Sequence, residues 1–564
     1  MAEFPPLRLR RLAIRRALTC CLAVALAAGC GWWPDSARAE PVARAMKPVT
    51  LEEYRRQVVF YNESVQLKLL ELEVNRRKLA AARAAFEPAL VLSGEHLDSQ
   101  RPNTVEQRRN LGGIADFDER NNLYSAGLEW LAPTGTTLGF RYMLRDLTNN
   151  LQGNEALLFQ SPDSGELVTF IGIELTQPLL KDRGTTATLA AIRLAAGESE
   201  LAYQDYRREM MVILSSAEIA YWNLRFAQEQ SEYWGESLRV AEKILSDQQA
   251  SLEAGRGSEL DVMMAKAAAA ERSAKKAEAW QKLVEASNAA ASFFSASAAD
   301  GFLLVATDQP AQPTARFTHA ASRAVAVSSN PDFLSQAIRM KMDDVRVDYA
   351  RNQSLPRLDL KASAGFNGLG DTVTSSWDDV RATDYPVWSV GLELRIPLGN
   401  RLGANQLAAA RLRRQQTVMG VNQIAIQIDN AIDNAIEKLQ AAEEATRSYR
   451  VAVEVNQGIL DTEMERLGVG KSDSRKVLEA EENLFESKVT LLRTQVQLAR
   501  SFLEVELFEG SILARRDLDL SQDEIQQQTA TILRKNRWND RQYQRFLDDF
   551  RATLAPSAPP SPAP

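Results

Sequence analysis

Two long spans of the chain contain no proline, and this feature most constrains the fold. The first span lies between Pro178 and Pro310, and the second lies between Pro397 and Pro556. Both are rich in Ala, Leu, Glu, Gln, Arg and Lys, which favour helices. Proline would break a helix interior because it lacks an N–H and clashes with the preceding turn. The sequence therefore predicts very long helices.

A pair of glycines interrupts each span once. These are Gly255 with Gly257 and Gly468 with Gly470. Glycine is common where a helix ends and the chain reverses, so we expect two helical hairpins, at about 185–297 and about 401–515. The arm over 185–254 would be about 100 Å long. Such helices also occur in plain coiled-coil rods, which stay an alternative.

Alternating strands precede both hairpins and argue against a plain rod. In 387–396, Trp388, Val390 and Leu392 share one face, whereas Ser389 and Glu393 share the other. Segments of about ten residues with this alternation are typical of membrane β-barrels. The strands that we expect are 89–97, 124–131, 136–147, 169–176, 358–366 and 387–396.

A shorter helix precedes each strand region. Thr50-Leu51-Glu52-Glu53 has the form of a capping box and predicts a helix to about residue 85. Asn330 before Pro331 predicts a second such helix to about residue 352. The chain thus contains two repeats, each consisting of a helix, strands and a long helical hairpin.

The spacing of the landmarks shows where the two repeats differ. Pro88 and Pro356 are 268 residues apart, whereas Pro178 and Pro397 are only 219 apart. The first strand region is therefore longer by 49 residues. A predicted hairpin around Pro133-Thr134-Gly135 falls in this surplus. The sequence leaves open whether that hairpin joins a barrel or protrudes from its mouth.

The N-terminus resembles an export signal, with arginines followed by an apolar run. Cleavage after residue 29 would leave Cys30 as a lipid anchor, and cleavage after residue 39 is the alternative. Cys20 and Cys21 are the only other cysteines. The predicted domains are a signal peptide (1–29), an N-terminal linker (30–48), a first repeat (49–300), an inter-repeat linker (301–329), a second repeat (330–515) and a C-terminal helix with a Pro-rich tail (516–564).

Composition and motifs argue against several functions. The net charge of −7 and the lack of a basic stripe disfavour nucleic-acid binding. The only histidines, His96 and His319, have no ligand-like partner pattern. The sequence also lacks the common metalloprotease, phosphate-loop and serine-hydrolase motifs. We therefore predict no catalytic, cofactor or metal site, and no enzyme.

The ordered, repeated motifs resemble the TolC / outer membrane efflux protein family over about 49–513. The resemblance implies an α+β membrane protein: a homotrimer with a trimeric β-barrel in outer-membrane lipid and an α-helical periplasmic tunnel. It also implies a periplasmic membrane-fusion adaptor and an inner-membrane pump as partners. The motifs are Thr50-Leu51-Glu52-Glu53, Phe86-Glu87-Pro88, Leu175-Thr176-Gln177-Pro178-Leu179, Ala220-Tyr221, Ala254-Gly255, Leu260-Asp261-Val262 and Leu467-Gly468-Val469-Gly470.

The resemblance also places candidate sites at the hairpin tips. Gly255, Gly257, Gly468 and Gly470 would mark the contact with the adaptor. The periplasmic gate would include Asp261, Asp473, Lys476 and Glu479.

Lys476 stands where the family commonly has aspartate. Lys476 and Glu479 could form an ordinary surface ion pair. Alternatively, ion pairs between protomers would hold the gate, which predicts weaker cation selectivity than an all-acid ring.

The sequence thus predicts an outer-membrane channel subunit with a periplasmic extension, which conducts export or efflux substrates. A periplasmic coiled-coil structural or adaptor protein without a channel is the alternative.

Overall fold

The computed structural model describes residues 45–152, 165–294, 302–309, 316–469, 471–472, 474–520 and 522–535. The chain divides into two units, Met1–Ala45 and Met46–Pro564, and the second is described here. The predicted signal peptide, Cys30, Gly470, Asp473 and the Pro-rich tail lie outside the described residues.

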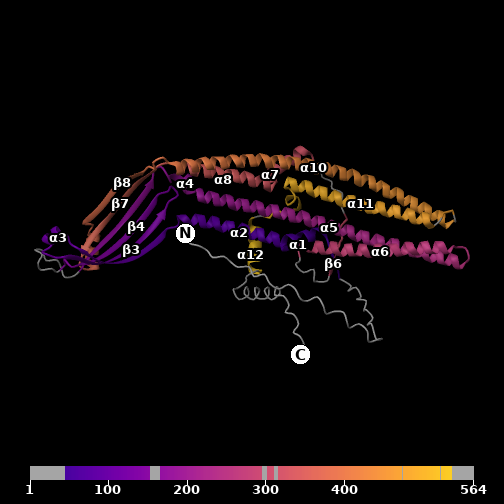
Figure 1. Cartoon of the computed structure of the whole chain (residues 1–564), viewed down its shortest axis with the longest axis horizontal. Helices are drawn as coiled ribbons and strands as arrows, with labels where there is room; N and C mark the ends of the chain where they lie inside the picture. The colour runs from indigo at the N-terminus through magenta and orange to yellow at the C-terminus, as the bar shows by residue number, and fades with distance from the viewer. Residues whose placement is uncertain are drawn as a thin grey trace, which may run out of the picture. The chain divides into compact units, whose positions relative to one another are not determined.

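One six-stranded antiparallel sheet contains all six predicted strands. Its order is β2-β3-β4-β5-β7-β8, so the hairpin of β3 and β4 is part of the sheet. Figure 1 shows the strands side by side at one end of the helices. The strands are β2 (Ala89–Pro102), β3 (Asp116–Leu131), β4 (Thr137–Asn149), β5 (Glu166–Pro178), β7 (Arg357–Gly370) and β8 (Tyr385–Arg395).

Two long helical hairpins extend from the sheet, as the proline-free spans predict. The first consists of α5 (Ala190–Glu253) and α6 (Glu259–Ala291), and the second of α10 (Arg401–Gly468) and α11 (Ser474–Glu509). The 64 residues of α5 correspond to about 96 Å. A short helix, α4 (Gly184–Thr188), precedes α5, so the first arm is not continuous from its start.

The predicted single helix from residue 51 to about 85 is wrong. The structure has α1 (Leu51–Tyr61), α2 (Glu63–Arg83) and a 3-10 turn, η1 (Ala84–Phe86). Asn62 interrupts the helix in an extended conformation, with φ −67° and ψ 123°. Its side chain accepts a hydrogen bond from Val65 N (3.2 Å) and donates one to Phe293 O (3.0 Å). These bonds compensate for the interrupted helix.

The cap of the second short helix is confirmed. Asn330 accepts hydrogen bonds from the backbone N–H groups of Asp332 and Phe333, and Pro331 begins α8 (Pro331–Gln353). This arrangement satisfies two otherwise free donors of the first turn.

The stretch predicted as a linker, 301–329, contains regular structure. β6 (Phe302–Ala306) pairs with β1 (Ala45–Val49), and α7 (His319–Ser329) follows. Two small helices connect strands, α3 (Val105–Asn110) and α9 (Val373–Ala382), and α12 (Gln522–Lys535) follows the second hairpin after a 3-10 turn, η3 (Ala514–Arg516).

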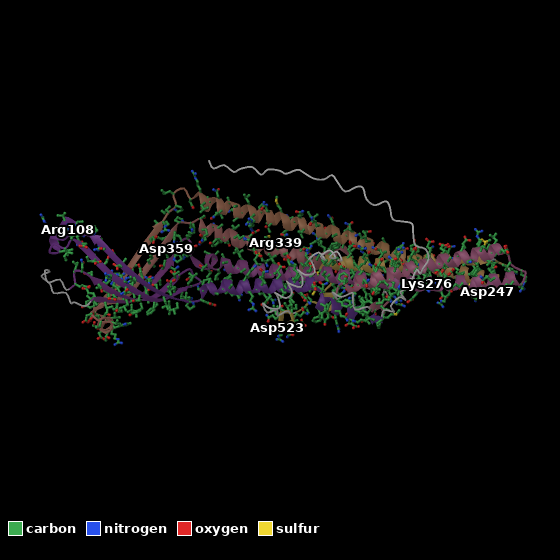
Figure 2. The ribbon with its side chains drawn as sticks, turned by 60° about the horizontal axis from the view of Figure 1, so that its bottom comes forward. Arg108, Asp247, Lys276, Arg339, Asp359 and Asp523 are labelled. Atoms are coloured by element: carbon green, nitrogen blue, oxygen red, sulfur yellow. The ribbon has the colours of Figure 1, made fainter. Side chains whose placement is uncertain are left out.

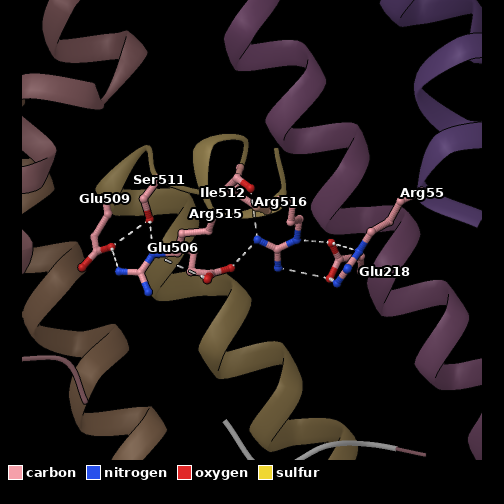
Figure 3. A network of polar contacts seen from close by, with 8 residues as sticks. All are labelled: Arg55, Glu218, Glu506, Glu509, Ser511, Ile512, Arg515 and Arg516. Carbon is pink, nitrogen blue, oxygen red and sulfur yellow. Dashed lines mark hydrogen bonds and ion pairs between the residues drawn. The ribbon is translucent and has the colours of Figure 1, made fainter. Parts of the chain in front are cut away.

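A buried network of charges joins α1, α5 and the end of the second hairpin (Figure 3). Only 2% of the Glu218 side chain is exposed. Its carboxylate accepts two hydrogen bonds of 2.8 Å from Arg55 and two, of 2.5 and 3.2 Å, from Arg516. Arg516 also donates to Glu506 (2.6 Å). Burial raises the pKa of Glu506, and the charge of Arg516 opposes this shift.

We expect Glu218→Gln to destabilise the fold strongly. The substitution keeps the shape but removes the counter-charge of Arg55 and one of the two counter-charges of Arg516. Breaking a buried ion pair costs about 3–5 kcal/mol. Thermal unfolding in detergent measures the effect. The matched control is Glu52→Gln, in an exposed pair with Arg56, and should change stability little. Equal shifts for the two variants would contradict this account.

Candidate functional site

One face of the sheet carries an apolar band that crosses all six strands. The register places one row of residues across the sheet: Leu90, Leu128, Phe140, Ile173, Ala364 and Trp388. All except Ala364 are large apolar side chains that are exposed in the single chain. Soluble monomers rarely expose a patch of this kind, whereas an apolar outer band is what a membrane barrel presents.

The opposite face of the sheet is polar and concave. Ion pairs cross between its strands, Arg141 with Glu174 at 3.3 Å and Lys361 with Glu393 at 2.6 Å. A hollow of about 590 Å³ on this side is lined by Gly127, Glu129, Arg141 and Glu174, among others. The sheet therefore curves with its charged face inward, as in a water-filled barrel.

Helix α9 covers one end of the apolar face. Its Ser376 forms a 2.7 Å hydroxyl–hydroxyl hydrogen bond with Thr169 of β5. Trp377 stacks on Tyr142 of β4, with ring centroids 5.5 Å apart. A Cβ atom on Gly368 would lie 1.9 Å from Ser376 O, so glycine is required for this close approach. The exposed apolar band thus ends at α9.

Both edges of the sheet are open in the described chain. β2 and β8 each pair on one side only. On β8 the exposed fractions are 75% for Trp388, 64% for Val390 and 68% for Leu392. The edges therefore combine unpaired backbone groups with large apolar side chains.

The predicted glycine turn of the first hairpin lies at its tip. Gly255 has φ +75°, a conformation that favours glycine. A Cβ on Gly257 would lie 2.8 Å from Leu252 N. Ser258 then caps α6 by accepting a hydrogen bond from Leu260 N (3.2 Å).

At the second tip, Gly468 is the last residue of α10. Figure 2 labels Asp247 near the tips and Arg108 at the far end of the sheet, at opposite ends of this unit.

The structure brings Asp261 of the first tip close to the second tip. Asp261, Arg475 and Ser472 all line one cavity of about 450 Å³ between the hairpins. Lys476 and Glu479 lie exposed on α11, and an ion pair between them stays a prediction. The roles of the predicted gate and tip residues also stay predictions.

Glu463 lies beside this cavity and is held in its charged form. Ser472 donates a 2.6 Å hydrogen bond to its carboxylate. This bond lowers the pKa of Glu463, and the positive charges of Arg466 and Lys476 add to the shift. The second tip thus carries interleaved charges of both signs.

A largely buried ion pair that the sequence does not predict joins the two hairpins. Arg272 of α6 lies 3.4 Å from Glu481 of α11 and donates to Ser237 of α5 (3.0 Å). Burial raises the pKa of Glu481, and the charge of Arg272 opposes the shift. The ring of Phe485, one turn further along α11, lies 4.3 Å from that of Trp234. The ion-pair partners are 209 residues apart, so no local spacing could have indicated them.

The described residues contain no group of three or more His, Cys, Asp or Glu side chains that could hold a metal ion. None of the helices in the described part of the chain is sufficiently long and apolar to cross a membrane.

Comparisons with known proteins agree with this geometry. The profile of a family described as outer membrane efflux protein matches residues 324–510. A search of curated protein sequences finds no significant match.

Solved structures share the fold over most of the chain. The CmeC outer membrane channel of Campylobacter jejuni is 15% identical, with a TM-score of 0.57, over 85% of this chain and 89% of that one. VceC, an outer membrane protein of Vibrio cholerae, is 17% identical, with a TM-score of 0.54, over 82% and 96%. The open MtrE outer membrane channel of Neisseria gonorrhoeae is 15% identical, with a TM-score of 0.55, over 82% and 88%.

The solved structures therefore confirm the predicted α+β fold. The profile match over residues 324–510 agrees with the predicted family and with the predicted outer-membrane location.

We expect Arg272→Met to loosen the hairpin tips. The substitution leaves Glu481 mostly buried without its counter-charge, which is more costly than replacing both charges by apolar groups. Limited proteolysis at the tips should accelerate by about tenfold, and Arg272→Met with Glu481→Leu should restore much of the resistance.

The matched control for this prediction is Arg447→Met, which breaks an exposed pair with Glu444. Faster cleavage in the control, or no recovery in the double variant, would contradict a specific role for the buried pair.

Proposed function

We propose that this chain is a subunit of an outer-membrane efflux channel, a passive conduit with no catalytic chemistry of its own. The observation that carries the proposal is the six-stranded sheet with an apolar band on one face, a charged concave face and two open edges. The long helical hairpins provide the periplasmic extension. The family match over residues 324–510 supports the same function.

The open edges support the proposal that copies of this chain complete the barrel. In lipid, every backbone N–H and C=O group needs a partner within the protein. The six strands alternate in direction, so β2 and β8 run antiparallel to each other. Pairing β8 of one copy with β2 of the next therefore continues an antiparallel sheet and closes it into a ring.

The helices next to the two edges carry matching apolar stripes. Before β2, Phe60, Leu67 and Val74 are exposed at intervals of seven residues. After β8, Leu412, Met419 and Ile426 on α10 are exposed at the same interval. A seven-residue repeat is typical of helices that pack along their length. The same neighbouring copies would therefore bury the edge strands and the stripes together.

Three copies form the channel that we propose. This number follows from the family resemblance, and three of the similar structures are described as outer membrane channels or proteins. The hairpin tips at Gly255, Gly257, Gly468 and Gly470 would contact a periplasmic adaptor that joins the channel to an inner-membrane pump.

The gate that we propose lies between the tips. Asp261 and Arg475 line the cavity there, and Glu463 carries a pKa lowered by its neighbours. Together with Asp473, Lys476 and Glu479, these residues would set the ion preference of the entrance. A non-channel coiled-coil adaptor is the second candidate, favoured only by the length of the helices.

A planar lipid bilayer tests the proposed function. The detergent-extracted protein should form trimers that give discrete conductance steps. Lys476→Asp should raise cation preference because it adds negative charge at the entrance. The matched control is Lys282→Asp, at an exposed site on α6 away from the tips. A soluble monomer without conductance would contradict the channel and favour the adaptor.

A further inference from the structure

The hairpin of β3 and β4 forms part of the wall of the sheet. β3 pairs with β2 along its length, and β4 pairs with β5 from Thr137 to Leu147. The corresponding position in the second half, between β7 and β8, holds only α9. The first half thus supplies four strands to the sheet, whereas the second half supplies two.

We propose that this extra hairpin widens the barrel to eighteen strands, six from each of three copies. The inference rests on the proposed trimeric channel. An insertion of two strands keeps the alternation of strand direction, so the sheet can still close in antiparallel fashion. Without the hairpin, three copies would close a barrel of twelve strands.

Both faces of the sheet continue through the hairpin. Leu128 and Phe140 lie in the same apolar row as Leu90 of β2 and Ile173 of β5. On the charged face, Arg141 of β4 forms its ion pair with Glu174 of β5. A wall strand needs an apolar face towards lipid and a polar face towards water, in line with its neighbours. A hairpin folded over the mouth as a plug or lid would not need these two faces.

The tight turn of the hairpin is bound to the junction with the helices. Gly184 N, at the start of α4, donates a 2.9 Å hydrogen bond to Thr134 O. Gly135 has φ +89°, and a Cβ there would lie 2.5 Å from Asp182 O. Trp130 Nε1 donates to Phe86 O (3.0 Å), where the chain enters β2. Hydrogen bonds thus hold the hairpin of β3 and β4 to the chain at two places, just before β2 at Phe86 and just after β5 at Gly184.

The hairpin changes the bore of the barrel considerably. For strands about 4.8 Å apart and tilted by about 40°, eighteen strands give a backbone diameter of about 36 Å, against about 24 Å for twelve. The extra strands bring no extra long helices, because each half of the chain has one long helical hairpin. The helical tunnel and its tips, and not the barrel, would therefore determine which solutes pass by size.

Cryo-electron microscopy of the detergent-extracted oligomer tests the inference directly. We expect a ring of eighteen strands from three copies, with β3 and β4 in the wall. A conducting trimer with twelve wall strands and the hairpin outside the wall would overturn the inference but leave the proposed function intact. Failure to form a conducting ring would overturn the proposed function itself.

Deletion of residues 116–149 provides a second test. In the intact sheet, Leu90 lies in one row with Leu128, Phe140 and Ile173. After the deletion, β2 could therefore pair directly with β5 in the same register, with Leu90 opposite Ile173. Polyethylene glycols of intermediate size, added on the barrel side, should enter the wild-type channel and be excluded from the variant. Exclusion from the tip side should not change, since the helices are untouched. Equal exclusion on the barrel side would overturn the inference.

A pair of glycine variants tests the anchored turn. Gly135 and Gly113 both have positive φ. A Cβ atom would come close to other atoms at Gly135, but it would have no atom within 4 Å at Gly113. Gly135→Ala should therefore lower the temperature at which the oligomer dissociates more than Gly113→Ala does. Equal effects would show that the turn is not held at the junction.

Discussion

Lipid offers no hydrogen-bond partner to the backbone, and this constraint governs the whole structure. β2 and β8 each have one side without a strand in the described chain, and β8 also exposes Trp388, Val390 and Leu392. A six-stranded sheet is too narrow to curl onto itself around a channel. In the proposed channel the chain therefore needs neighbours at both edges. Because the two edges differ, the contact between copies would be heterologous, and rotation about one axis would close it into a ring.

The helical part meets a different requirement, which is to keep very long helices in a fixed arrangement. Helices of this length bury only one stripe, and α10 uses Ile432, Ile436 and Leu439 for that purpose. Charged contacts add specificity across the bundle. Glu218 binds both Arg55 and Arg516, and Arg272 reaches Glu481 on the other hairpin. The first network lies in the body of the bundle and the second lies towards the tips, where an opening movement would separate the hairpins.

Much of the fold could be predicted because its signals are local. Proline-free spans, glycine turns and alternating strands indicated both hairpins and all six strands. The break at Asn62 was missed because its cause is a distant contact with Phe293 O. The sequence predicts a linker where β6 and α7 lie, since the pairing of β6 with β1 depends on residues far apart in sequence. The sequence could also not place the extra hairpin, which the register with β2 and β5 determines. The sequence predicts Asp261 at a tip, but only the structure shows that Asp261 and Arg475 line the same cavity.

Disulfide cross-linking between copies tests the central claim, that β8 of one copy pairs with β2 of the next. Cysteines occur only at positions 20, 21 and 30, so engineered pairs have little competition. Val390→Cys would be combined in turn with cysteine at Leu90, Leu92 and Gly94, which share the apolar face. At least one pair should give dimers and trimers on denaturing gels without reductant. Val390→Cys with Val91→Cys, on opposite faces, should not. Cross-links independent of the face, or none in any same-face pair, would contradict the account.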